Sequence, residues 1–285
     1  MKVYYHVAAF LIIVAISIFF HAQDFAWLIG QWQTNPYYQH GFYVFIVSCL
    51  FTLFRFTRVD WSRVSSRGPF WFLPSTFWWL IAAILYWSGR AFSVENIHHY
   101  LRSLAFLFML RGLIGFWLRE RVAKAFSFPI FYPALAIPFP HFEAISQLLR
   151  EATMHLSTKV FNLFGVSAYS HESGLIIKSM AFPIDQAFTG IESLILLVTF
   201  VVLLVYVFES KELVQALVVI LVLPLAFVGC VVRVLTFLVL GYSFSSNIAS
   251  TYWSYWATPT FYLVSFLLIG ITWALIHYLF KIKKG

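Results

Sequence analysis

The chain has 285 residues, of which 61% are hydrophobic and only 11% carry a charge. A soluble core does not need that much apolar surface, so the composition excludes a soluble globular protein and indicates a polytopic membrane protein. The formal net charge is +8, but the basic residues are dispersed beside apolar runs, which argues against a nucleic-acid partner. The partner that the composition predicts is the lipid bilayer.

A membrane-spanning helix needs roughly 20 mostly apolar residues, and about eight such segments follow one another along the chain. The first resembles a signal peptide but has no small-x-small cleavage site, so we interpret it as a retained span. The fifth is short and contains three prolines, so we expect it to be kinked or re-entrant. The sequence therefore predicts an all-α integral membrane protein, a single polytopic domain over residues 1–285. The expected spans are residues 3–20, 41–57, 70–88, 97–118, 125–140, 187–208, 213–240 and 255–280.

The distribution of lysine and arginine predicts how these spans are oriented. Cytoplasmic loops are enriched in these two residues. If the N-terminus lies inside, most basic loop residues fall on the cytoplasmic side, and only four fall on the other side. We therefore expect a multi-pass protein of the cell membrane (the inner or plasma membrane), with both termini in the cytoplasm. The four basic residues expected on the outer side are Arg90, Arg150, Lys159 and Lys178.

The longest stretch outside the expected spans is residues 140–186, on the outer side. Between residues 142 and 164, apolar residues recur at three- and four-residue steps opposite a polar face. This pattern predicts an amphipathic helix that lies along the membrane surface and ends at Gly165. After Gly165 the pattern becomes extended, with a turn at Ser173-Gly174, which predicts a short β-hairpin.

Two ionisable residues stand inside the last expected spans. Arg233 is the one charge between Leu213 and Ser254, and Glu192 lies near the start of the apolar run before it. An ionised side chain in hydrocarbon costs at least about 2.5–3.5 kcal/mol on insertion scales. The pair therefore indicates a functional site in which the acid and the guanidinium compensate each other. The simpler alternatives are an Arg233 that extends to the lipid headgroups and a purely structural ion pair.

The expected topology brings further residues to the outer end of the bundle, near the depth of Arg233. His98 and His99 also fit an interfacial role at a span end. Cys49 and Cys230 fit packing as small hydrophobic residues. No ligand set typical of a metal site is evident, so we expect no metal and no other cofactor. The residues that converge are His40, Gly41, His98, His99, Arg102, Phe188, Thr189, Gly190, Cys230 and Ser254.

In their order and spacing these motifs resemble the exosortase/archaeosortase family of multi-pass membrane cysteine transpeptidases. The resemblance extends from about residue 38 to residue 270. The family's Ala-Cys-Ser-Gly-Ile-Arg-Ser signature aligns without gaps on residues 187–193, and its Asn-x-x-Arg box aligns on residues 230–233. Its final histidine falls on Ser254. The other similar segments are His40-Gly41, Ile137-Pro138-Phe139-Pro140 and Leu163-Phe164-Gly165-Val166.

The resemblance implies a protein that recognises C-terminal sorting signals of exported proteins, each made of a short motif, a membrane span and a basic tail. The family's cysteine attacks the backbone just outside the membrane, which needs a thiolate, a cation and a proton donor. Here Phe188 stands at the nucleophile position, Ser254 stands at the acid/base position, and Glu192 replaces a basic residue. Of the three groups, only the cation Arg233 remains.

Three hypotheses follow, and they leave open whether the chain is an enzyme. In the first, a degenerate member binds a sorting signal without cleaving it, and Arg233 holds a peptide carboxylate or carbonyl. In the second, an active peptidase or transpeptidase uses Cys230 or, with less support, Thr189 as its nucleophile. In the third, the chain is an unrelated transporter or lipid-modifying enzyme. The catalytic candidates are Arg233, Cys230, Thr189 and Ser254, and the candidates for substrate binding are His40, Arg102, Phe188, Gly190 and Glu192.

Overall fold

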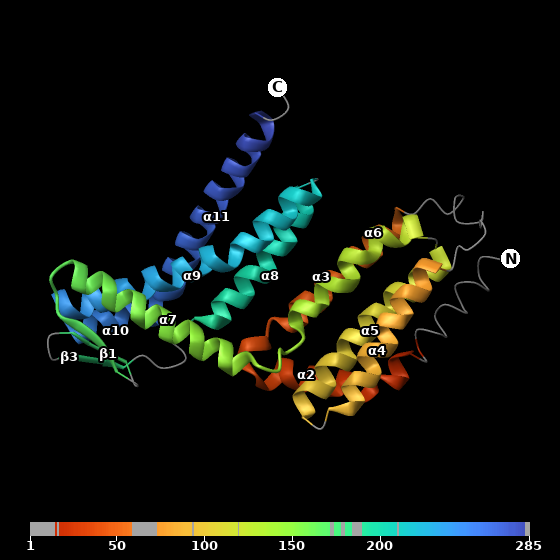
Figure 1. Cartoon of the computed structure of the whole chain (residues 1–285), viewed down its shortest axis with the longest axis horizontal. Helices are drawn as coiled ribbons and strands as arrows, with labels where there is room; N and C mark the ends of the chain where they lie inside the picture. The colour runs from red at the N-terminus through yellow and green to blue at the C-terminus, as the bar shows by residue number, and fades with distance from the viewer. Residues whose placement is uncertain are drawn as a thin grey trace. The chain divides into compact units, whose positions relative to one another are not determined.

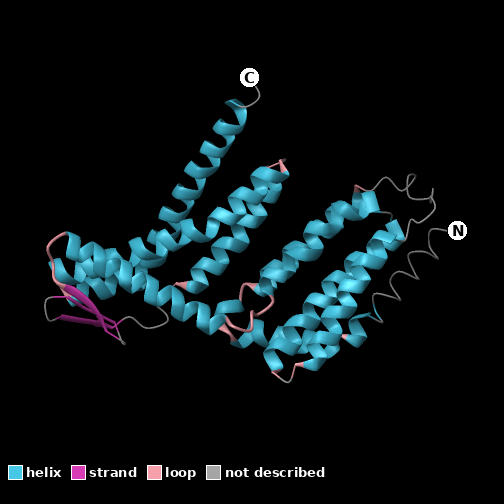
Figure 2. Cartoon of the chain, in the orientation of Figure 1, coloured by secondary structure: helices cyan, strands magenta, loops and turns pink. Residues whose placement is uncertain are grey.

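The computed structural model describes residues 15, 17–58, 73–92, 94–118, 120–171, 174–177, 180–183, 190–209 and 211–282. Helices account for nearly all regular structure in these residues, as predicted (Figures 1 and 2). Contacts along the chain define two compact units, Met1–Pro140 and His141–Gly285, and each is described by itself. The expectation of a single domain over residues 1–285 stays a prediction.

The first unit is built around α5 (Glu95–Leu118), which packs against α4, α6 and α2. Its helix α3 packs against α6 and the 3-10 turn η3. Small residues allow close approach at one of these contacts, since a Cβ added at Gly112 would lie 2.6 Å from the indole nitrogen of Trp79 in α4. The remaining elements are α2 (Ala22–Thr34), η1 (Pro36–Tyr38), α3 (Gly41–Thr57), α4 (Leu73–Ala91), α6 (Glu120–Phe131) and η3 (Tyr132–Ala136).

The fifth expected span changes from α-helix to 3-10 helix near its prolines. Helix α6 contains Pro129 and is followed at Tyr132 by η3. Because Pro133 has no N–H, it cannot bond the carbonyl four residues earlier. The hydroxyl of Ser48 in α3 donates to that carbonyl, the one of Pro129. A side chain of the neighbouring helix α3 therefore supplies the hydrogen bond that Pro133 cannot donate to the Pro129 carbonyl.

The second unit has a helical part in which α9 packs against α8, α10 and α11. A Cβ added at Gly229 would overlap the hydroxyl of Ser265, so glycine lets α9 and α11 approach closely. Apolar side chains of α8, α9 and α11 form one buried cluster around Leu197, Val222 and Phe261. These helices are α8 (Ile191–Phe208), α9 (Glu212–Ser243), α10 (Ser246–Tyr255) and α11 (Ala257–Ile282).

The amphipathic helix expected before Gly165 is confirmed as α7 (Phe142–Leu163). Gly165 adopts φ 74°, and the N–H groups of Gly165 and Val166 bond the carbonyls of Asn162 and Phe161. This pattern is a Schellman motif, which needs a left-handed residue after the helix. The sequence therefore placed the end of α7 correctly.

The expected β-hairpin is a three-stranded antiparallel sheet in order β1-β2-β3. Its strands are β1 (Ala168–His171), β2 (Gly174–Ile177) and β3 (Met180–Pro183). The third strand adds Phe182 to Leu175 and Ile177 in a cluster buried against α9 and α10. A hairpin alone would leave this apolar face with less cover, which explains the extra strand.

Five of the described helices are long and apolar enough to span a membrane. They correspond to the second, fourth, sixth, seventh and eighth expected spans. Helix α4 covers most of the third, α6 with η3 forms a shorter apolar stretch over the fifth, and most of the first lies outside the described residues. The helices α2 and α10 were not predicted. The qualifying spans are Pro36–Thr57, Asn96–Trp117, Ile191–Phe208, Glu212–Ser243 and Ala257–Leu279.

Candidate binding site around Arg233

Arg233 lies in α9 with only 2% of its surface exposed. Its guanidinium carbon is 5.0 Å from the ring centre of Trp253 in α10 and 5.6 Å from that of Phe261 in α11. The hydroxyl of Tyr252 reaches the main-chain carbonyl of Arg233 at 3.5 Å. Aromatic faces attract a guanidinium and fix its plane. The cation is therefore buried in the protein and held in position by three helices of the second unit.

Gly190, the N-cap of α8, lies next to the guanidinium of Arg233. Its backbone is left-handed, with φ 63°. A Cβ added there would overlap Nη2 of Arg233. Glycine is thus needed twice, for the left-handed backbone and for contact with the guanidinium. The N-terminus of a helix carries a partial positive charge. Together with Arg233 it makes a positive, preorganised position suited to a carbonyl oxygen or a carboxylate.

Other candidates from the sequence lie around this position in different ways. Glu192 is in the first turn of α8 with its side chain exposed. Cys230 is one helical turn from Arg233, is 3% exposed and belongs to the apolar cluster of α8, α9 and α11. The exposed hydroxyl of Ser254 donates to the carbonyl of Ser250 in its own helix. Phe188 and Thr189 lie outside the described residues.

His40 and Arg102 belong to the first unit, so neither unit by itself joins them to Arg233. His40 is buried beside Tyr38, with 6.1 Å between the ring centres. A Cβ added at Gly41 would overlap the indole of Trp32, whose nitrogen donates to the carbonyl of Ala136 at 2.8 Å. The His-Gly motif therefore lies at a packing contact between α2, α3 and η3.

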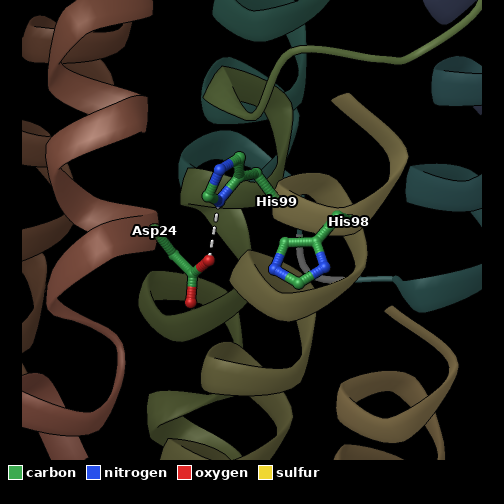
Figure 3. Close-up of side chains that lie close together, drawn as sticks. All are labelled: Asp24, His98 and His99. Carbon is green, nitrogen blue, oxygen red and sulfur yellow. Dashed lines mark hydrogen bonds and ion pairs between the residues drawn. The ribbon is translucent and has the colours of Figure 1, made fainter. Parts of the chain in front are cut away.

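Arg102 belongs to a buried polar cluster that sequence reasoning missed. Its centre is Asp24 in α2, whose side chain is 2% exposed. The carboxylate accepts from Nδ1 of His99 at 2.8 Å and from Nδ1 of His21 at 3.1 Å, and pairs with Nε of Arg102 at 3.2 Å (Figure 3 shows Asp24 with His99). Asp24 is an acidic residue four positions after the end of the first expected span, and this was the signal available in the sequence.

Burial raises the pKa of the Asp24 carboxyl, but the hydrogen bonds from His21 and His99 and the charge of Arg102 outweigh it. The pKa therefore lies below its ordinary value, and Asp24 is a carboxylate at neutral pH. The guanidinium of Arg102 compensates the charge of the Asp24 carboxylate. This ion pair joins α2 to α5 and carries no net charge.

The same cluster has the composition of a metal site, since ligand atoms of Asp24, His98 and His99 lie within 4.8 Å of one another. The hydrogen bonds of His98 argue for a different use. Its Nδ1 is 2.9 Å from the carbonyl of Gly89, which can only accept, so Nδ1 carries the proton. Its Nε2 then accepts from Nη1 of Arg102 at 2.9 Å. Arg102 thus uses both His98 and Asp24, and its charge disfavours a second cation there.

The fold and the preorganised buried cation define a multi-pass helical membrane protein with one positive site at the start of α8. The family model described as Transmembrane exosortase (Exosortase_EpsH) matches residues 32–271. The chain therefore belongs to the transmembrane exosortase family, as its motifs predicted. No curated protein and no solved structure matches the chain. Family membership removes the hypothesis of an unrelated transporter or lipid-modifying enzyme.

Proposed function

We propose that this exosortase-family protein binds C-terminal sorting signals of exported proteins at the outer membrane surface and does not cleave them. The observation that carries the proposal is the geometry of Arg233, a buried guanidinium fixed between Trp253 and Phe261 and against Gly190. Burying a guanidinium costs free energy unless neighbouring groups compensate its charge, and a bound peptide can supply such a group. Arg233 is suited to bind a peptide carbonyl or carboxylate through charge-assisted hydrogen bonds.

The absence of cleavage follows from the chemistry of the aligned residues. Phe188 stands where the family has its cysteine, and a phenyl ring cannot attack a carbonyl. Ser254, at the acid/base position, has a hydroxyl that donates to its own helix. With both termini in the cytoplasm, as the basic residues predict, Gly190 and Arg233 face the outer surface. The proposed function is therefore that of a receptor for exported proteins with a C-terminal sorting signal, called tailed proteins below.

The experiment is co-expression with an exported protein from the same genome that ends in a short segment, an apolar span and a basic tail. Mass measurement of its C-terminus reports cleavage, and co-purification reports binding. We expect an uncut tail that co-purifies with the wild type. The variant Arg233→Ala should reduce retention about tenfold or more, since hydrogen bonds to charged groups contribute about 1.5–3 kcal/mol. Arg90→Ala, which removes an exposed arginine, is the control. A shortened tail would overturn the binding-only proposal.

The second candidate function is cleavage by Cys230, and its position one helical turn from Arg233 is the observation that favours it. A nucleophilic thiol must be accessible to its substrate. Cys230 is instead packed among apolar residues of α8, α9 and α11. We expect Cys230 to stay unmodified by a membrane-impermeant alkylating reagent in intact cells, as measured by mass shift. Rapid modification that is lost in Cys230→Ala would favour cleavage over binding alone.

A further inference from the structure

The second unit contains a groove between α7 and the sheet that the site around Arg233 does not use. The groove has a volume of about 830 Å³. Its lining comes mainly from polar and apolar side chains of helix α7, and Ser170 of strand β1 borders it. The lining includes Gln147, Arg150, Glu151, Met154, His155 and Ser170.

The orientation of the β1 backbone follows from a contact with Asn162 at the end of α7. The Asn162 amide donates to the carbonyl of Ala168 at 3.0 Å, and its oxygen accepts from the N–H of Ala168 at 2.9 Å. The side-chain amide thus pairs with Ala168 as the backbone of a neighbouring strand would. The N–H and C=O of Ala168 therefore point away from β2. Because these groups alternate in direction along a strand, those of Ser170 also point away from β2.

The register of the sheet indicates independently that the backbone groups of Ser170 point away from β2. His171 pairs with Gly174, and two residues lie between them. A two-residue hairpin loop is closed by a pair whose N–H and C=O groups bond each other. Pairs then alternate, so Tyr169 bonds Ile176, whereas Ser170 and Leu175 form a pair without mutual hydrogen bonds. The backbone of Ser170 is thus available on the side of the sheet that lies next to α7.

The two edge strands of the sheet differ in whether their outward backbone groups can pair with another strand. The strand order makes β1 and β3 the edges of the sheet. By the same alternation, Pro183 points outward from β3, and proline has no N–H to donate. Proline on an edge strand blocks further pairing. The β1 edge has no such block at Ser170. Ser170 borders the polar groove, so β1 is the edge that can accept another strand there.

We propose that an extended peptide binds along this groove as an added strand, with its backbone paired to Ser170. The inference rests on the proposed function, and it assigns the peptide to the short segment of the sorting signal that precedes its membrane span. Recognition is by backbone hydrogen bonds, the mode of strand addition. The lining carries one arginine and one acid, with Glu151 already bonded by Gln147 at 2.9 Å. This balance favours a segment without strong net charge. Because Asn162 already bonds the outward groups of Ala168, the segment pairs with β1 at Ser170 alone.

The test uses the tailed protein described above and three variants of this chain. Ser170→Pro removes the outward N–H but no hydrogen bond to β2, so the sheet should persist. Ser170→Ala keeps the N–H and is the matched control. Tyr169→Pro removes an N–H that faces β2, and it should lower the thermal midpoint instead. A photo-crosslinking residue at position 170, compared with one at the exposed Leu163, locates the bound segment in the unaltered fold.

Retention by the wild type and by Ser170→Ala, with a loss of about tenfold in Ser170→Pro at an unchanged thermal midpoint, is the expected result. The crosslink from position 170 should map to the segment before the span. Equal retention by Ser170→Pro, or a crosslink elsewhere on the tail, would overturn strand addition and leave the proposed function intact. Failure of the wild type to retain any tailed protein would overturn both.

Discussion

Gly190→Ala should reduce retention of a tailed protein about tenfold or more, although the change adds a single methyl group. The methyl carbon would overlap Nη2 of Arg233, so the guanidinium must leave its position between Trp253 and Phe261. The left-handed φ of 63° adds about 1–3 kcal/mol of backbone strain. We therefore expect a loss of binding as large as that of Arg233→Ala, measured by co-purification.

The chain offers a matched control for the backbone part of this effect. Gly165 also has a left-handed φ, of 74°, but a Cβ there would meet nothing within 4 Å. Gly165→Ala should thus carry a similar strain and leave retention unchanged. If both variants lose retention alike, the loss comes from strain and not from displacement of Arg233. If neither does, the guanidinium is not part of the binding site.

Regular periodicity explains which parts of the fold could be predicted. Helix α7 has an uninterrupted apolar face and ends at a glycine, and both features are local to the sequence. The long apolar helices follow from composition in the same way. Helix α10 is different, since its ten residues are only weakly apolar and begin at a serine cap. Its formation depends on tertiary packing of Ala249 and Tyr252, which sequence periodicity does not report.

The sequence predicted the charged residue of the candidate site, but it did not predict which side chains contact that residue. Arg233 is conspicuous because its surroundings in the sequence carry no other charge. Its aromatic neighbour Trp253, however, stands beside the predicted Ser254 and was not among the predicted site residues. A helix turns about 100° per residue, so adjacent residues face different partners. The side chain that contacts Arg233 is therefore the neighbour of the one expected.

Asp24 illustrates the same limit over a longer separation. It lies 75 residues from His99, its hydrogen-bond partner. Sequence spacing contains no signal that α2 and α5 meet. His98 and Arg102 are four residues apart on one helix and were placed together, but the carboxylate that orients the cluster was not. Buried networks between elements are found only once packing is known.

Asp24→Ala should be among the most destabilising single changes in the first unit. It leaves Arg102 without its carboxylate and leaves His21 and His99 without their acceptor. Removing one partner of a buried ion pair typically costs about 3–5 kcal/mol. We expect a marked fall in the thermal midpoint in detergent. Glu143→Ala, which removes an exposed carboxylate, should change it little. Similar midpoints for the two variants would show that the cluster does not tie α2 to α5.

The pH dependence of stability tests whether Asp24 stabilises the first unit as a charged carboxylate, because a contribution from packing alone would not change with pH in this way. Because the pKa of Asp24 is lower in the folded protein than its ordinary value of 3.8, the folded state binds this proton less readily than the unfolded chain. The stabilisation is present above that value and is lost as the pH falls through the lower folded pKa. Below about pH 4, the wild type should therefore lose stability more steeply than Asp24→Asn, which has no proton to gain. Parallel curves for the two proteins would mean that Asp24 is not held as a carboxylate by His21, His99 and Arg102.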